Sequence, residues 1–140
     1  MLYTRSLLST ALWFLFVVRQ STAQVGNYTK IEMVKDIRLG SSNSNPSYLT
    51  AVNGELYFRA TDGTNGYEVW KSDGTSTGTV MVKDISPGSS GSYPMELIAV
   101  NGELYFRAND GTNGYELWKS DGTSAGTVMV KDIRSGSSTS

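Results

Sequence analysis

A 48-residue repeat covers most of this 140-residue chain and limits the folds that are open to it. Segment 34–81 aligns with segment 82–129 without a gap, and 38 of the 48 positions are identical. Repeats of this length are typical of architectures in which one supersecondary unit packs on the next. We therefore divide the chain into repeat 1 (34–81), repeat 2 (82–129) and the start of a truncated third repeat (130–140).

The pattern within each repeat predicts short antiparallel strands. Asn53-Gly54 is a strong signal for a two-residue hairpin turn, because both turn residues must adopt positive φ. The stretch behind it alternates, which places Leu56, Phe58 and Ala60 on one face of a strand. In repeat 1 the expected strands are residues 48–52, 55–60, 67–72 and 79–85, joined by Gly-containing turns.

Four strands in about 40–50 residues are the content of a β-propeller blade. The fold class expected is therefore all-β, with four-stranded antiparallel, blade-like repeats that form part of a propeller. A β-solenoid is the alternative, although its coils usually repeat at shorter periods and lack consecutive hairpins. Because a closed ring needs about four blades or more, we expect a fragment of a longer array. The competing explanation is self-assembly of several copies through blade edges.

The first 23 residues have the layout of a secretory signal peptide. Arg5 precedes the apolar stretch 7–18, and the small residues Ser21 and Ala23 fit a cleavage site after Ala23. The apolar stretch is shorter than the roughly 20 residues of a membrane-spanning helix, so no membrane span is expected. Residues 24–33 then form an N-terminal lead-in, and the protein is expected to be secreted.

Secretion gives meaning to Asn27, which begins an Asn-Tyr-Thr acceptor sequence for glycosylation. Three-residue matches are common by chance, so an unmodified asparagine near the terminus is the alternative.

Two segments of the repeat carry a recognisable signature. Tyr115-Glu-Leu-Trp-Lys-Ser-Asp-Gly-Thr123, followed by Gly126-Thr127 and Val130-Lys-Asp-Ile133, resembles the ELWxxDGT repeat family. The equivalent segment 67–75 departs from that pattern only in Val69, and the resemblance covers residues 32–140. It implies a secreted or surface protein with propeller-like repeats, in a family without an assigned biochemical activity.

Composition removes several classes of function. Twelve Lys and Arg face thirteen Asp and Glu, so no basic surface for nucleic acid is expected. The chain has no Cys and no His, which excludes Cys–His and Ser–His catalysis and thiolate or imidazole zinc sites. Carboxylates are the only sizeable pool of reactive groups that remains.

The acidic residues recur in both repeats in the same local context. A catalytic site is usually built once per domain, so we expect no enzyme, and a carboxylate-based glycoside hydrolase fragment is the alternative. Oxygen ligands in a Gly-containing loop also suit calcium, although Asp-Gly and Asn-Gly are ordinary turn residues. The candidate calcium ligands are Asp62, Asn65, Glu68, Asp110, Asn113 and Glu116, and no other cofactor is expected.

Aromatic residues also recur, and they suggest an extracellular ligand. Tyrosine and tryptophan rings can stack on sugars, and a repeated array favours multivalent binding. The alternative for Trp70 and Trp118 is packing between neighbouring blades. The recurring set is Tyr57, Tyr67, Trp70, Tyr105, Tyr115 and Trp118. The leading hypothesis is a secreted noncatalytic repeat module for extracellular binding or adhesion to carbohydrate or protein, and a purely structural surface spacer is the third possibility.

Overall fold

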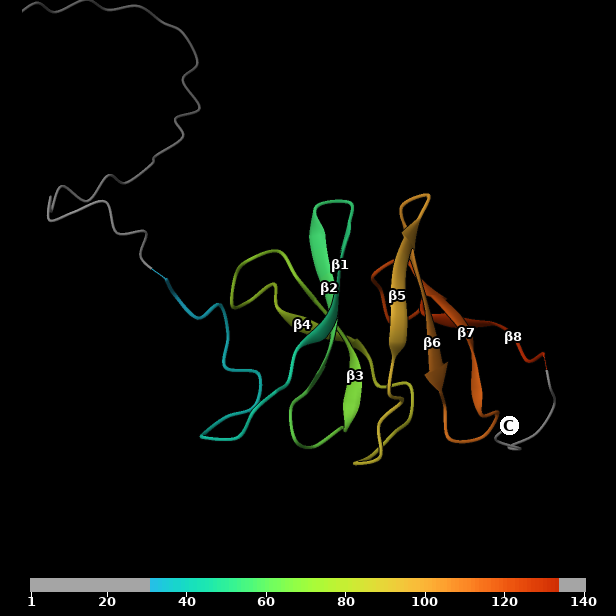
Figure 1. The fold of residues 1–140 in the computed structure, drawn as a ribbon, viewed down its shortest axis with the longest axis horizontal. Helices are drawn as coiled ribbons and strands as arrows, with labels where there is room; N and C mark the ends of the chain where they lie inside the picture. Colours follow the sequence, from blue (N-terminus) through green and yellow to red (C-terminus); the bar gives the residue numbers. More distant parts are fainter. Residues whose placement is uncertain (1–30, 134–140) are drawn as a thin grey trace, which may run out of the picture. The chain divides into compact units, whose positions relative to one another are not determined.

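The computed structural model describes residues 31–133, and they form two four-stranded antiparallel sheets with no helix among them (Figure 1). The first sheet consists of β1 (Ser47–Val52), β2 (Glu55–Thr61), β3 (Tyr67–Ser72) and β4 (Val80–Lys83). The second sheet consists of β5 (Met95–Val100), β6 (Glu103–Asn109), β7 (Tyr115–Ser120) and β8 (Val128–Lys131). In both sheets the strands lie in chain order, so each repeat folds into one sheet.

The all-β expectation is thus confirmed for the described residues. The expected signal peptide (1–23), Asn27 and residues 134–140 of the third repeat lie outside them. Within residues 31–133, no helix has the length and apolar character needed to cross a membrane.

The hairpin turns form where the sequence places them. Asn53 has φ 49° and Gly54 has φ 86°, and Asn101 and Gly102 repeat this conformation with φ 51° and 83°. Such positive φ values are those of the turn that matches the twist of two antiparallel strands. The first three predicted strands of repeat 1 agree with the structure to within one residue at each end.

The fourth strand is shorter than predicted. Residues 79–85 were expected to be extended, but β4 ends at Lys83. The chain leaves the sheet there because the backbone N–H groups of Ile85 and Ser86 donate hydrogen bonds to the buried carboxylate of Glu68. A side chain on β3 therefore ends β4.

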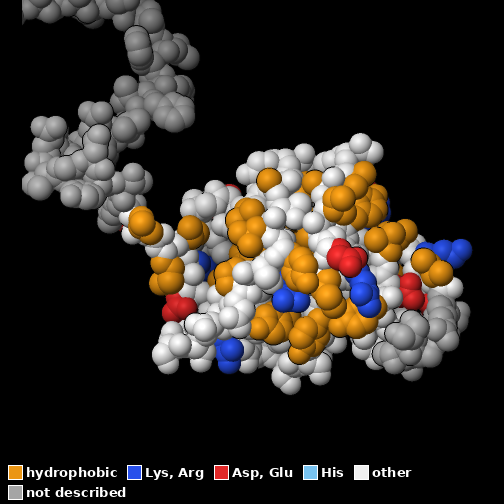
Figure 2. Space-filling view, viewed as in Figure 1, with side chains coloured by type: hydrophobic (Ala, Val, Ile, Leu, Met, Phe, Trp, Pro, Cys, Tyr) orange, Lys and Arg blue, Asp and Glu red, His pale blue; other side chains and the backbone are white. Residues whose placement is uncertain are grey.

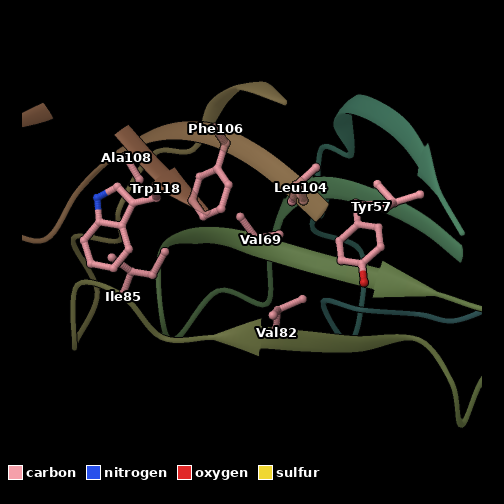
Figure 3. Packing of buried hydrophobic residues seen from close by; sticks show 9 residues of the cluster. Tyr57, Val69, Val82, Ile85, Leu104, Phe106, Ala108 and Trp118 are labelled. Carbon is pink, nitrogen blue, oxygen red and sulfur yellow. The ribbon is translucent and has the colours of Figure 1, made fainter. Parts of the chain in front are cut away.

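The core lies between the two sheets, and Figure 3 shows its side chains pointing toward one another from both sides. Leu104, Phe106 and Ala108 of β6 alternate with solvent-facing residues, as the pattern predicts, and are fully or almost fully buried. They pack against Val69 of β3 and Tyr57 of β2. These two side chains lie on the face of the first sheet opposite to Phe58. Burying an aliphatic or aromatic side chain contributes roughly 1.5–3 kcal/mol, so this layer dominates the stability of the pair.

Two polar contacts fix how the hairpins of the two sheets align. Thr50 Oγ1 donates to the Leu97 carbonyl at 2.9 Å, and Asn53 Nδ2 donates to the Gly102 carbonyl at 2.8 Å. The hydroxyl of Tyr57 lies against Gly122, where a Cβ atom would clash with it. Glycine at that turn thus permits both the positive φ of 89° and the close approach of the tyrosine.

The face of the first sheet that points away from the second sheet is covered by a connecting segment rather than by a sheet. Phe58, Ala60 and Trp70 form a second cluster with Ile37 and Met81. Lys35 Nζ donates to the Thr79 carbonyl at 2.7 Å, which ties residues 34–37 to this face. The second sheet has the same contact, from Lys83 Nζ to the Thr127 carbonyl at 2.8 Å. The Val-Lys-Asp-Ile segment therefore has one structural role in both repeats.

A matched pair of substitutions tests this packing. Leu104 is 0% exposed between the sheets, whereas its repeat equivalent Leu56 is 38% exposed. We expect Leu104→Ala to lower the free energy of unfolding by about 2–5 kcal/mol, because it removes apolar contacts and leaves a cavity. Leu56→Ala should cost less than half as much. Urea unfolding in dilute solution measures both, and equal losses would contradict an inter-sheet core.

Candidate functional site

The acidic loop residues that were candidates for calcium binding are engaged by the protein itself. Asp62 Oδ1 accepts hydrogen bonds from the backbone N–H groups of Thr64 and Asn65 at 2.8 and 2.9 Å. Asp62 Oδ2 accepts from the side-chain amide of Asn65 at 2.7 Å. Asp110 makes the same bonds with Thr112 and Asn113. These are Asx-type turns, in which the carboxylate stabilises its own loop.

The pKa of Asp62 agrees with this role. Partial burial works against ionisation, but the hydrogen bonds from Asn65 and Thr64 outweigh it and hold the pKa below its usual value. The pKa of Asp110 is lowered by the same balance in the second repeat.

Glu68 lies in the core rather than in the loop. Its side chain is fully buried, and its carboxylate accepts hydrogen bonds from four donors. The backbone N–H groups of Ile85, Ser86 and Ser92 donate at 3.3, 3.4 and 2.7 Å, and the Ser92 hydroxyl donates at 2.5 Å. Glu68 thus holds both ends of the segment that connects the two sheets.

Glu116 occupies the equivalent position in the second sheet. Within residues 31–133 its carboxylate accepts a hydrogen bond from the backbone N–H of Ile133 at 3.3 Å.

The predicted calcium ligands are therefore not gathered around one point. A calcium ion between Asp62, Asn65 and Glu68 would have to displace the turn bonds of Asp62 and the core bonds of Glu68. Within residues 31–133, no group of three or more Asp or Glu side chains is arranged to hold a metal ion. A calcium site stays a prediction, because in the structure Asp62, Asn65 and Glu68 make hydrogen bonds within the protein instead.

The aromatic residues divide into buried and exposed sets. Trp118 is buried in the cluster that joins the two sheets, whereas Trp70 is buried in the cluster under Ile37, away from the second sheet. Tyr57 is also buried, between the sheets, and its hydroxyl donates to Glu55 Oε2 at 3.2 Å. Burial, followed by the neighbouring Glu55 carboxylate, raises the pKa of Tyr57 to about 12. These three rings are not available for stacking on a ligand.

Tyr67 belongs instead to a partly exposed group, which we call the tyrosine–arginine cluster: Tyr48, Arg59, Tyr67 and Tyr93. The guanidinium carbon of Arg59 lies 4.8 Å from the centroid of the Tyr48 ring and 5.1 Å from that of Tyr67. The rings of Tyr67 and Tyr93 are 5.5 Å apart and inclined by 40°. Tyr48 and Tyr93 are both exposed, so two ring surfaces and a cation are presented together.

Neighbouring side chains hold this cluster in place. Arg59 Nε donates to Ser47 Oγ at 3.1 Å, and Asn45 Nδ2 donates to the Tyr67 hydroxyl at 2.9 Å. Such bonds reduce the conformational freedom that a ligand would otherwise have to remove. The cluster is therefore pre-organised on its strands.

A bulge in β1 positions Tyr48. The register of β1 against β2 shifts between Ser47 and Thr50, and Tyr48 has φ 56°. A non-glycine residue in this conformation is strained, and such strain is concentrated at functional sites. The second sheet repeats the bulge, with Glu96 at φ 57°, so the backbone device is common to both repeats.

The side chains of the cluster, in contrast, are not repeated in full. In the second sheet Arg107 lies over the ring of Tyr115 at 4.4 Å, but Glu96 stands where the first sheet has Tyr48. Five of the ten differences between the repeats fall at positions 43, 45, 47, 48 and 50. The sequence alone indicates only Tyr67 of this cluster, although the concentration of differences points to the positions of Tyr48 and Tyr93.

The chain matches no protein-family model, and no curated protein or solved structure was found to be similar to it. The geometry of residues 31–133 is therefore the basis for the functional argument.

The buried Glu68 gives a testable pH dependence. Burial raises its pKa to about 7, against the opposing effect of the four hydrogen bonds. Because the folded-state pKa lies above the unfolded value of about 4.5, the folded protein binds this proton more tightly. The contribution of Glu68 to stability is thus greatest below about pH 4.5 and decreases until about pH 7. The decrease is on the order of 3 kcal/mol.

We expect Glu68→Gln to remove this dependence, because glutamine does not titrate. Urea unfolding at pH 5 and pH 8 gives the difference for each variant. Glu116→Gln is the matched control and should keep the wild-type difference. An unchanged difference in Glu68→Gln would show that Glu68 does not titrate in this range.

Proposed function

We propose that this protein is a secreted, noncatalytic module that binds an extracellular carbohydrate through the tyrosine–arginine cluster. The observation that carries the proposal is the arrangement of Arg59 between two tyrosine rings on an exposed part of the first sheet. We propose further that the two sheets are consecutive blades of a propeller-type array.

The chemistry of the cluster favours a saccharide with an acidic group. Tyrosine rings offer flat apolar surfaces with a polar tip, and they lose little conformational entropy on binding. The planar guanidinium of Arg59 can pair with a carboxylate or sulfate through two parallel hydrogen bonds. An apolar ring surface beside a fixed cation therefore fits a sugar ring that carries a negative charge.

Export is supported by the layout of residues 1–23 and by the resemblance to ELWxxDGT repeats. The blade interpretation is supported by the four-stranded meander of each repeat and by the packing of one sheet face on the next. A solenoid coil would not need two consecutive hairpins in each repeat.

A noncatalytic role is supported by the use made of the acids. Asp62 and Asp110 stabilise their own turns, and Glu68 accepts hydrogen bonds from four donors in the core. A glycosidase needs two carboxyl groups that face the same bound sugar. The acids that would supply such a pair serve the fold instead.

A glycan array that includes uronic-acid and sulfated saccharides tests the proposal. We expect binding to an acidic saccharide, and we expect Arg59→Ala to weaken it about tenfold or more, since a charged hydrogen bond contributes about 1.5–3 kcal/mol. Tyr48→Ala should also weaken it, because this substitution removes one of the two rings beside Arg59. Arg107→Ala is the matched control, because Arg107 stacks on one ring and lacks a tyrosine at position 96. It should bind like the wild type.

Two results would overturn the proposal. Equal binding by the wild type and Arg59→Ala, both shown to be folded by circular dichroism, would remove the cluster as the site. Turnover of a bound saccharide that is abolished by substituting one carboxylate would replace the binding module by an enzyme.

A further inference from the structure

The second sheet exposes a face that the first sheet buries. One face of the first sheet packs against the second sheet, and its side chains are buried; Val69, for example, is 0% exposed. The residues on that face are Val52, Tyr57, Val69, Val82 and Ile85. The repeat equivalent of Val69 in the second sheet, Leu117, is 42% exposed. The same holds along the whole set, which we call the outer face: Val100, Tyr105, Leu117, Val130 and Ile133 are all partly or largely exposed. Exposed hydrophobic side chains gather over both sheets in Figure 2.

The outer face is also hollowed. A depression of about 330 Å³ is lined by residues that include Ile98, Tyr105 and Leu117. In the first sheet the equivalent positions are Thr50, Tyr57 and Val69, and there Leu97 and Leu104 of the second sheet pack against Tyr57 and Val69. The shape that fits such a depression is thus known from within the chain, and it is a leucine pair from β5 and β6.

Within residues 31–133, the first sheet presents the same leucine pair with no second sheet packed on it. Leu49 and Leu56 are the repeat equivalents of Leu97 and Leu104, and both are exposed. They border an open depression of about 240 Å³ on the face that carries Phe58. We call Leu49, Leu56 and Phe58 the receiving face.

The turns beside this face are open in the same way. Gly122 is in contact with the Tyr57 hydroxyl, whereas nothing lies within 4 Å of a Cβ atom built on its equivalent, Gly74. Gly102 accepts a hydrogen bond from Asn53, whereas nothing lies within 4 Å of a Cβ atom on Gly54. Among the described residues, the inter-sheet contacts at Gly102 and Gly122 therefore have matching open positions at Gly54 and Gly74.

We propose that the outer face of one copy of this chain docks on the receiving face of a second copy, in the arrangement that joins the first and second sheets within one copy. Leu49 and Leu56 of the second copy then fill the depression around Leu117. Asn101 donates to the Gly54 carbonyl, and Tyr105 lies against Gly74. The partner surfaces are nearly identical to surfaces that already pack together, which is the reason for choosing a second copy as the occupant.

One segment has to move for this contact to form. Val34–Ile37 lie on the receiving face, held by Lys35, at the place that Val82–Ile85 occupy on the second sheet. The docking copy brings Val130–Ile133, which have the same sequence, to that place. Val130–Ile133 therefore replace Val34–Ile37, with Lys131 taking over the Thr79 carbonyl. Exchange of identical elements costs little, and burial of the outer face is the net gain.

The contact is head-to-tail, because the two faces that meet are different. Such heterologous contacts generate rings or open chains according to the rotation between copies. This assembly is independent of carbohydrate binding, and it uses sheet faces rather than the strand edges expected from the sequence.

Analytical ultracentrifugation of the purified protein over a range of concentrations tests the proposal. We expect reversible association of the wild type. Leu117→Lys on the outer face and Leu56→Lys on the receiving face should each weaken it about tenfold or more, because each buries a charge in place of a leucine. Val128→Lys is the matched control, since its equivalent Val80 remains 38% exposed in the presence of the second sheet. Circular dichroism establishes that each variant is folded.

A mixing experiment tests the head-to-tail geometry. Leu56→Lys keeps an intact outer face, and Leu117→Lys keeps an intact receiving face. An equimolar mixture should therefore form a 1:1 dimer that neither variant forms alone. Lys35→Ala should strengthen association of the wild-type chain, because it loosens the segment that is displaced, and Lys131→Ala should weaken it.

The proposal is overturned by a wild type that stays monomeric up to its solubility limit. It is equally overturned if both lysine variants associate like the wild type, or if their mixture forms no dimer.

Discussion

A four-stranded sheet whose two faces are both apolar cannot bury itself, and this constraint governs the whole molecule. In the first sheet, residues of one parity on β2 and β3 pack on the second sheet, and residues of the other parity pack under Ile37. Each sheet therefore needs two covers, one from a neighbouring sheet and one from a connecting segment. The repeat encodes the sheet and both covers in 48 residues, so each unit depends on a neighbouring unit to cover one of its faces.

Glu68 connects this burial to the path of the chain. A carboxylate with no exposed surface is costly, and it is tolerated here because four donors of the connecting segment surround it. The same bonds satisfy backbone N–H groups that leave β4 and would otherwise lie unpaired in the core. The glutamate thus sets where β4 ends and where the next sheet begins.

The sequence alone predicts the strands and the hairpin turns, but it does not predict the partners of individual side chains. Alternation predicts that Leu56 and Tyr57 face opposite sides of the sheet, and Asn53-Gly54 predicts the turn. Both features depend on local backbone geometry. The role of Glu68 depends on residues 17–24 positions away, which the local pattern does not contain. The calcium hypothesis grouped Glu68 with Asp62 for their proximity in sequence, whereas the strand directs the two side chains to different surroundings.

The tyrosine–arginine cluster was missed for a related reason. It joins Tyr48 on β1, Arg59 on β2 and Tyr93 in the connector, and only the fold brings them together. Tyr48 and Tyr93 also stand at positions where the repeats differ, so an approach that looks for repeated residues passes over them.

That distribution of differences separates two demands on the sequence. Packing favours the same or similar residues in each unit, as at Val69 and its equivalent Leu117, because every sheet offers its neighbour two similar faces. Recognition of a ligand has no such requirement, and positions 45, 47 and 48 lie at the bulged end of β1, where side chains can vary without altering Leu56, Phe58 or Leu104. In the proposed head-to-tail assembly each copy would add one tyrosine–arginine cluster at a fixed spacing. Weak individual sites would then bind a polymeric saccharide with an avidity that a single site does not reach. The uniform faces would set the spacing, and the variable bulge would set the specificity.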